Sequence, residues 1–380
     1  MKTLTRFTSA MGLAIAAVAA FAVPANASDR GSFRHSRSEH VVFVQNDSVT
    51  GNQVIAYDRA SDGTLTQEGT YSTGGLGGVL TGSVVDHLAS QGSLTYDRRH
   101  RRLYAVNAGS NTVSVFSVRG DRLSLRQVLP SGGTFPVSVA VHDDLVYVLN
   151  ARDGGSVQGY RVFFGLVLPI SRSNRSLALA AVTTPEFVST PGQVAFSPDG
   201  EQLLVTTKAN GNAIDVFGVR HDGRLSATPV VNSEPGAVPF AVDFDAAGHL
   251  VVTEAGTNSV ATFSLASNGT IAPIDAKATG QSATCWVVQA NGTFYASNAG
   301  SGSLSSYQSS LTGLLTPVGL TPTDAGSVDA AVTPDQQYLY VQAGAAGIVD
   351  AFRVNADGSL TSIGSVTVPD AVGGEGIVAI

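Results

Sequence analysis

The chain has 380 residues and a net charge of −7, and only 13% of its residues are charged. This composition does not predict a nucleic-acid-binding surface, which would show clustered Lys and Arg. The single cysteine, Cys285, excludes an internal disulfide, so the fold must be stable through burial alone.

The first 27 residues are typical of a signal peptide. A positively charged start precedes an apolar run over residues 11–23, and a small-x-small cleavage site ends at Ala27. We therefore expect a secreted, extracellular protein that begins at Ser28, with a loose polar leader over residues 28–40. The apolar run is too short to cross about 30 Å of hydrocarbon, so no membrane span is expected.

From residue 41 onwards, a short phrase that ends on an aromatic residue occurs seven times, and four of the six gaps are 44–46 residues long. A period of about 40–45 residues built from short strands is typical of a β-propeller blade. No helical period competes with it. The sequence therefore predicts an all-β domain over residues 41–380, a seven-bladed β-propeller with four-stranded antiparallel blades. The repeated aromatic residues are Tyr57, Phe116, Tyr160, Phe217, Phe263, Tyr307 and Phe352.

A complete repeat contains an apolar inner strand, a second strand, an alternating third strand and a fourth strand after a tight hairpin. Turns such as Asp222-Gly223 suit the positive φ angles of two-residue hairpins. The first repeat lacks its inner strand, whereas the last five residues, 376–380, have the apolar character of one. We expect this C-terminal strand to pair in the first blade and close the ring, which would remove open sheet edges.

Two gaps are longer than the others and place insertions at about residues 72–91 and 165–190. Both are expected between an outermost strand and the next inner strand. That connection crosses the face that bears the mouth of the central channel, and long loops at such places often carry function.

Functional side chains are expected around this mouth, where second strands end and inner strands begin. Asn ends the second strand in four of the seven repeats, which suits a structural role in a turn. Glu254 and Lys208 replace it with a charge. Glu254 is a candidate general acid or base, or else a solvated loop carboxylate. Lys208 could bind an anionic group, or its longer loop could carry it outward. His87, in the first insertion, could titrate near neutral pH or simply be solvated.

Other side chains at the rim are candidates for ligand binding. Two of them, Phe240 and Trp286, could form an apolar floor or belong to the core, and Arg152 could bind a ligand or pair with Asp153. No metal site is expected, because no His or Cys pair has ligand spacing. No cofactor is expected either, because no glycine-rich phosphate loop opens a helix. The binding candidates are Arg152, Gln193, Phe240, Trp286, Asp329 and Glu375.

Three phrases, LYAVNAGSNTVSVFSV, PGQVAFSPDGEQLLVTTK and VVTEAGTNSVATFSL, together resemble the seven-bladed lactonase family, which includes 6-phosphogluconolactonases and carboxymuconate-cyclase-like proteins. The resemblance covers residues 41–380. Within it, SVQGYRV is similar to a secreted, mostly bacterial subgroup. The resemblance implies lactone hydrolysis at the channel mouth.

The sequence departs from the family pattern at two positions. Family enzymes carry His after Pro at the fourth inner strand, where Pro191 is followed here by Gly192-Gln193. They carry Arg-His after Pro in the fifth blade, where Pro239 is followed here by Phe240. The family's acidic residue is retained as Glu254, and Lys208 matches a basic position of some members.

Three functions therefore remain open. A lactone hydrolase would use Glu254 as the base for water attack and Lys208 to stabilise the oxyanion, so these residues and a His or Arg should converge. A non-catalytic propeller would bind a small molecule or glycan at the same mouth. An extracellular scaffold for protein partners would have its mouth plugged by the two insertions. A monomer without nucleic-acid partners is expected in each case.

Overall fold

The computed structural model describes residues 40–181 and 184–380. The expected signal peptide and the leader up to residue 39 lie outside the described residues. Within the described ranges, no helix is both long enough and apolar enough to cross a membrane.

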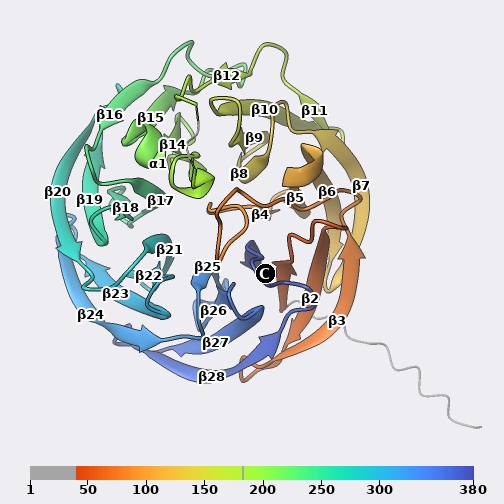
Figure 1. Ribbon diagram of the computed structural model, residues 1–380, viewed down its shortest axis with the longest axis vertical. Coiled ribbons are helices and arrows are strands. Elements are labelled where there is room, and N and C mark those ends of the chain that lie inside the picture. Colours follow the sequence, from red (N-terminus) through yellow and green to blue (C-terminus); the bar gives the residue numbers. More distant parts are fainter. Residues whose placement is uncertain (1–39, 182–183) are drawn as a thin grey trace, which may run out of the picture. The chain divides into compact units, whose positions relative to one another are not determined.

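Seven sheets form a ring around a central channel (Figure 1), which confirms the predicted seven-bladed propeller. Each sheet runs outward from an inner strand, and neighbouring strands are antiparallel. The strands of blades 1 and 2 are β29 (Ile377–Ala379), β1 (Val41–Gln45), β2 (Gln53–Arg59) and β3 (Leu65–Ser72), then β4 (Leu94–Asp97), β5 (Arg102–Asn107), β6 (Thr112–Arg119) and β7 (Arg122–Pro130).

The remaining five blades follow in chain order. Those of blades 3 and 4 are β8 (Pro136–His142), β9 (Leu145–Asn150), β10 (Ser156–Phe163), β11 (Leu166–Pro169) and β12 (Arg175–Ser176), then β13 (Gln193–Phe196), β14 (Gln202–Thr206), β15 (Ala213–Gly218) and β16 (Val230–Ser233). Those of blades 5 to 7 are β17 (Pro239–Phe244), β18 (Leu250–Glu254), β19 (Ser259–Leu265) and β20 (Ile271–Ala278), then β21 (Thr284–Ala290), β22 (Thr293–Asn298), β23 (Ser303–Ser309) and β24 (Leu315–Pro322), then β25 (Ser327–Val332), β26 (Tyr338–Ala343), β27 (Ile348–Val354) and β28 (Leu360–Thr367). Short helical turns are η1 (Ala108–Ser110), η2 (Glu186–Val188) and α1 (Lys208–Gly211).

The C-terminal strand closes the ring, as the sequence predicts. β29 pairs antiparallel with β1, with Phe43 opposite Val378. The first blade is therefore built from both ends of the propeller, and the hydrogen-bonding edge that β1 would otherwise leave open is paired.

The repeated aromatic residues pack between neighbouring blades. All seven are buried, with at most 4% of each exposed. Three of them also bond to the outermost strand of the preceding blade: the hydroxyl groups of Tyr57, Tyr160 and Tyr307 donate to the carbonyls of Thr367, Pro130 and Ala278. The repeat that reveals the fold in the sequence therefore marks the contacts that hold the blades together.

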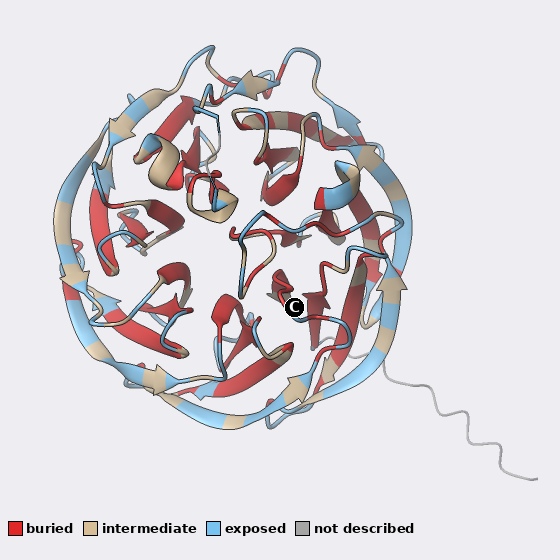
Figure 2. Ribbon diagram, viewed as in Figure 1, coloured by how far each residue is buried: buried red, intermediate tan, exposed pale blue. Residues whose placement is uncertain are grey.

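Burial falls from the centre of each blade to its rim (Figure 2). The second strands, such as β5 and β18, are almost entirely buried. The outermost strands, such as β28, alternate between exposed and half-buried positions. The core is thus a set of apolar layers between blades, and polar groups in the channel are enclosed by them.

The insertions differ in detail from the prediction. The first connects β3 to β4 and spans residues 73–93. The second starts later than predicted, because residues 166–169 form β11, the outer strand of blade 3, after a hairpin at Phe164-Gly165. Blade 3 also gains a short fifth strand, β12, which pairs with β10, so this one blade departs from the predicted four strands.

Candidate functional site

The first insertion, residues 73–93, crosses the centre of the ring at one mouth of the channel (Figure 1). Its last residues bond to the inner strands of several blades. The Ser90 hydroxyl donates to the Val137 carbonyl at 2.8 Å, and the Gln91 N–H donates to the Gly192 carbonyl at 3.0 Å. The indole N–H of Trp286 donates to the Ser90 carbonyl. We call residues 85–91 the plug, because they fill this mouth.

Lys208 is buried beneath the plug, with 1% of the residue exposed. Its ammonium group donates to the carbonyls of Ala89 at 2.7 Å and Phe187 at 2.6 Å, and to the Thr190 hydroxyl at 3.1 Å. An ammonium group has three N–H donors, so all of them are used. Burial lowers the Lys208 pKa to about 8. The side chain holds the two insertions on the ring and has no donor left for a ligand.

Three buried carboxyl groups lie at the same mouth, and one of them, Asp86, belongs to the plug itself. Glu375 accepts the N–H of Ser90 and lies within hydrogen-bond distance of the Ser90 hydroxyl, and burial raises its pKa. Burial also raises the pKa of Asp86 to about 6, although the positive charge of Lys208 acts in the opposite direction. Asp47 accepts the Glu375 N–H at 2.9 Å, and burial raises the Asp47 pKa to about 7. Sequence reasoning did not single out Asp47, Asp86 or Ser90, because they follow no repeat and no motif.

Glu254 lies at the end of β18 and is engaged locally. Its carboxylate accepts from the hydroxyls of Thr257 at 3.1 Å and Ser259 at 2.6 Å. Asn298 occupies the corresponding position in blade 6 and also contacts hydroxyls that follow it, as the donor to two serines on the next strand. Glu254 therefore makes the kind of turn contact that Asn makes elsewhere. Within the described chain, no hydrogen bond or ion pair joins it to Lys208 or His87.

The other two basic candidates, His87 and Arg152, also make contacts that involve the insertions. His87 packs its ring against Gly373, and burial lowers its pKa. Arg152 forms an ion pair with Glu186, with a distance of 2.7 Å from Nε to Oε1, and its guanidinium lies 4.2 Å from the centre of the Phe135 ring. Arg152 also reaches the Val79 carbonyl. It thus links the first insertion to the second, which carries Glu186, rather than pairing with Asp153.

The aromatic candidates form part of the core under the plug. The ring centres of Phe240 and Trp286 are 4.7 Å apart, and both residues are buried. Lys208 Nζ lies 5.2 Å from the Phe240 ring centre, within the range of a cation–π contact. The two rings are therefore not exposed to a ligand at this mouth, because the plug covers them.

A cavity of about 410 Å³ occupies the channel beyond the plug. It extends from Gln91 of the plug to His142 and Pro198 at the far ends of the inner strands. Two of the predicted binding residues line it. Gln193 accepts the Val242 N–H through Oε1 at 2.6 Å, and Asp329 accepts the Ala330 N–H at 3.0 Å. The full lining comprises Gln91, Gly92, Leu94, Thr95, Val139, Ala140, Val141, His142, Gln193, Val194, Ala195, Phe196, Ser197, Pro198, Asp329, Ala330 and Ile377.

Asp329 is the titratable carboxyl group of this cavity. Burial raises its pKa to about 7, against the opposing effect of hydrogen bonds from backbone N–H groups. The group can therefore exchange a proton near neutral pH. No group of three or more His, Cys, Asp or Glu suited to a metal ion occurs among the described residues.

The architecture defines a seven-bladed β-propeller whose channel is closed at one mouth and hollow beyond it. No protein-family model and no curated protein is similar enough to the sequence to match it. Solved structures are similar in fold.

A candidate 6-phosphogluconolactonase of Bacteroides fragilis NCTC 9343 is 18% identical, with a TM-score of 0.71, over 90% of this chain and 98% of that one. The periplasmic gluconolactonase of Pseudomonas aeruginosa is 17% identical, with a TM-score of 0.71, over 90% and 99%. Virginiamycin B lyase of Staphylococcus aureus is more distant, at 13% identity and a TM-score of 0.54, over 76% and 88%. The chain thus has the fold of the 6-phosphogluconolactonase-like propellers.

Proposed function

We propose that this protein is an exported, lactonase-like propeller that binds a small polar ligand, of the sugar-lactone class, in the channel cavity. The cavity is the observation that carries the proposal. Its volume of about 410 Å³ lies in the range of small-molecule pockets. Gln193 and Asp329 supply polar groups among mainly apolar lining residues, which is the usual character of such sites.

The plugged mouth is less well suited to a ligand. A mechanism with Glu254 as base and Lys208 at the oxyanion needs both groups free and close together. Lys208 donates to the insertions, and Glu254 accepts from its own turn. The proposed site therefore lies at the other end of the channel from the one that the family resemblance implies.

Hydrolysis of the bound lactone is the second candidate, and the raised pKa of Asp329 favours it. The ionised carboxylate would take a proton from a water molecule as the water oxygen attacks the ring carbonyl. The amide NH₂ of Gln193 would donate to the carbonyl oxygen as it gains negative charge. The ring C–O bond then breaks, the alkoxide takes the proton back, and the product is the hydroxy acid.

A panel of sugar γ- and δ-lactones with their hydroxy acids tests both steps. We expect the wild type to bind at least one lactone in calorimetry. The variant Asp329→Asn should bind it at least about tenfold more weakly, because a lost charged hydrogen bond costs about 1.5–3 kcal/mol. The variant Glu254→Gln should bind it as the wild type does. Hydrolysis followed by base uptake at constant pH separates an enzyme from a binding protein. Loss of binding in Glu254→Gln but not in Asp329→Asn would indicate that the ligand binds at the plugged mouth instead. Binding of no lactone would favour the scaffold function.

Export is the second part of the proposal and rests on residues 1–27. Mass spectrometry of the protein secreted by its natural host should find Ser28 as the first residue. An intact Met1 in mature protein would contradict export through this segment. The proposal also expects a monomer, which light scattering on the purified protein checks.

A further inference from the structure

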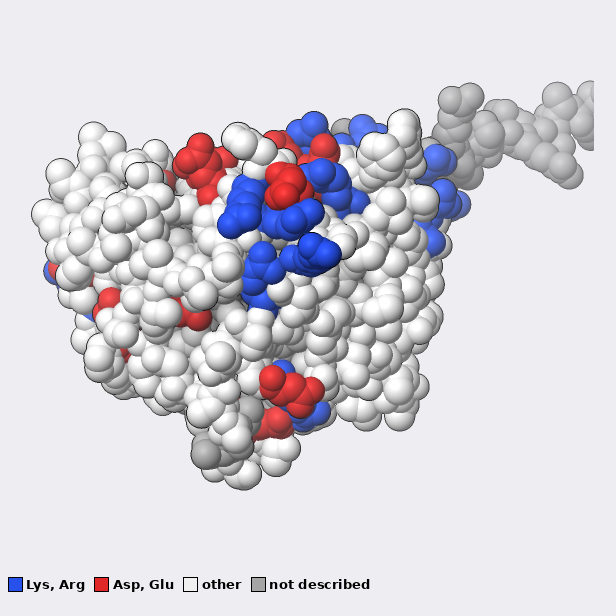
Figure 3. Space-filling model, turned by 90° about the horizontal axis from the view of Figure 1, so that it is seen from above, with Lys and Arg blue, Asp and Glu red and all other residues white. Residues whose placement is uncertain are grey.

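Positive charge is distributed unevenly around the ring. Residues 92–236, which form blades 2 to 4, contain 14 Lys and Arg against 11 Asp and Glu. Residues 237–380 contain 2 Lys and Arg against 11 Asp and Glu. The protein is therefore acidic on average but locally basic, and Figure 3 shows Lys and Arg side chains gathered in a patch on one edge of the propeller.

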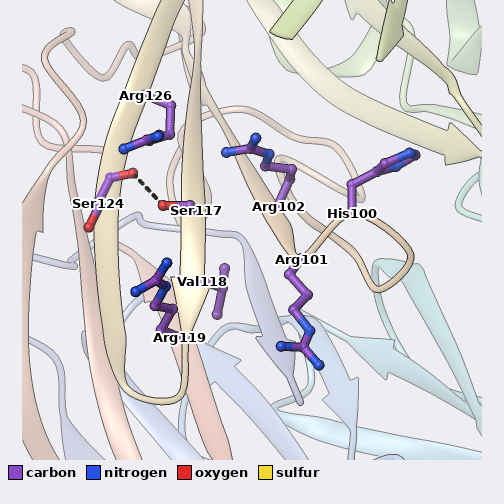
Figure 4. A pocket seen from close by; sticks show the side chains of 8 residues that line it. All are labelled: His100, Arg101, Arg102, Ser117, Val118, Arg119, Ser124 and Arg126. Carbon is purple, nitrogen blue, oxygen red and sulfur yellow. Dashed lines mark hydrogen bonds between the residues drawn. The ribbon is translucent and has the colours of Figure 1, made fainter. Parts of the chain in front are cut away.

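Within the basic half, one groove is built from a single blade. It has a volume of about 480 Å³ and lies on blade 2, outside the channel (Figure 4). Its residues come from β5, β6, β7 and the turn before β5. The lining residues are His100, Arg101, Arg102, Ser117, Val118, Arg119, Ser124 and Arg126.

Strand register places the polar members of this groove on one face. Arg102 lies opposite Ser117, and Ser117 lies opposite Ser124, so the three form a row across β5, β6 and β7. Arg119 and Arg126 are each two residues from a member of that row. Because side chains alternate along a strand, Arg119 points to the same face as the row. Arg126 lies at the β-bulge between β6 and β7, and it lines the same groove. Figure 4 shows their guanidinium groups around the Ser117 and Ser124 pair.

The arginines of this groove form no ion pair within the described chain, whereas His100 pairs with Asp97 and Asp144. Among the described residues, no ion pair involves Arg101, Arg119 or Arg126. Arg102 donates to the Gly165 carbonyl at 2.8 Å, whereas its Nε is buried without a hydrogen-bond partner in the described chain. Arginines that line one groove carry like charges, so an anion between them would relieve an unfavourable charge density.

We propose that the groove is a binding site for a small anion that carries two or more adjacent phosphate groups. Guanidinium groups bind phosphate oxygens through paired, charge-assisted hydrogen bonds, and several arginines on one face match several phosphates. The Ser124 hydroxyl adds a neutral donor, whereas the Ser117 hydroxyl donates to the Ser124 carbonyl at 3.4 Å. The groove volume fits a small molecule. This site is independent of the channel cavity and of the function proposed there.

The test is calorimetry at low salt with tripolyphosphate and, separately, orthophosphate. We expect the wild type to bind tripolyphosphate at least about tenfold more tightly than orthophosphate, because adjacent phosphates engage more than one arginine and each charged hydrogen bond is worth on the order of a factor of ten. The double variant Arg119→Gln/Arg126→Gln should bind tripolyphosphate at least about tenfold more weakly. Both arginines are exposed, so the variant should fold.

A matched control removes the same charge elsewhere. Arg220 in blade 4 and Arg353 in blade 7 are also exposed. Arg220→Gln/Arg353→Gln should bind tripolyphosphate as the wild type does. Equal weakening in both double variants, or equal affinity for the two phosphates, would overturn the proposal, because either result indicates a general effect of charge. Tighter binding of a short duplex DNA than of tripolyphosphate would also overturn it, in favour of a nucleic-acid surface.

Discussion

The two ends of the channel are built from the same inner strands and differ in what fills them. At one end, residues 85–91 bond to blades 1, 3, 4 and 6 and leave no open space around Lys208. At the other end, the same ring encloses a cavity of about 410 Å³. The comparison shows that the repeat determines the ring, whereas a single unrepeated loop determines which mouth can accept a ligand.

The largest effect is expected from Trp286→Ala, which removes the ring beneath the plug. Trp286 is 1% exposed and packs on Phe240, so the loss of packing should lower the free energy of unfolding by about 3–5 kcal/mol. Urea denaturation measures it. Phe164 is 89% exposed, and Phe164→Ala should cost less than about 1 kcal/mol. Similar costs for both variants would show that the plugged end is not a packed core.

An effect of about the same size is expected from Lys208→Met. The variant removes three donors and leaves the buried carbonyls of Ala89 and Phe187 without them, at a cost of about 1–3 kcal/mol for each unsatisfied group. Lys277 is partly exposed beside Asp275, so Lys277→Met is the control, with an expected cost below about 1 kcal/mol. A Lys208→Met protein as stable as the control would contradict the anchoring role of Lys208.

The melting temperature should fall between pH 5 and pH 8. Burial raises the pKa of Asp47 to about 7 and of Asp86 to about 6, and it raises that of Glu375 as well. When the chain unfolds, these groups release their protons near pH 4, so over this range the folded state binds more protons and stability declines as the pH rises.

The variant Glu375→Gln removes one of these titrations. It should narrow the difference in melting temperature between pH 5 and pH 8, as measured by calorimetry. An unchanged difference would show that burial does not raise the pKa of Glu375.

The smallest effect on stability is expected from Arg152→Ala, because its ion pair with Glu186 is partly exposed and should contribute about 1 kcal/mol or less. Local opening is a more sensitive measure. Cys285 is buried beneath the plug, and burial raises its thiol pKa, so a thiol reagent should label it slowly in the wild type. We expect faster labelling in Arg152→Ala, whereas equal rates would show that the two insertions hold the plug without this link.

The fold could be predicted because its evidence recurs. The spacing of Tyr57, Phe116 and their counterparts reports a contact that every blade makes with its neighbour. Residues 376–380 could be assigned because the first repeat lacks one strand. Blade 3 was predicted less well, since its outer hairpin at Phe164-Gly165 carries no Asx-Gly signal and β11 was therefore assigned to the insertion.

The candidate site was predicted only in part. Departure from the repeat singled out Glu254 and Lys208, but a repeat cannot show that Glu254 makes the turn contact that Asn makes, or that Lys208 faces inward. Gln193 and Asp329 were named from their positions on inner strands, which is where they line the cavity. The path of the plug depends on contacts between residues 47 to 285 positions apart, and no local pattern encodes them. The basic groove was missed because composition averages charge over the whole chain.

Hydrogen exchange of the backbone N–H groups of the plug tests the central claim most directly. The N–H groups of His87 and Gln91 donate to Gly373 at 2.7 Å and Gly192 at 3.0 Å, inside the ring. Mass spectrometry of the native protein should find peptides that cover 85–91 protected for as long as those of the inner strands β8 and β21. Exchange of the plug within seconds, with β8 and β21 still protected, would show that this mouth is open in solution and would contradict the account.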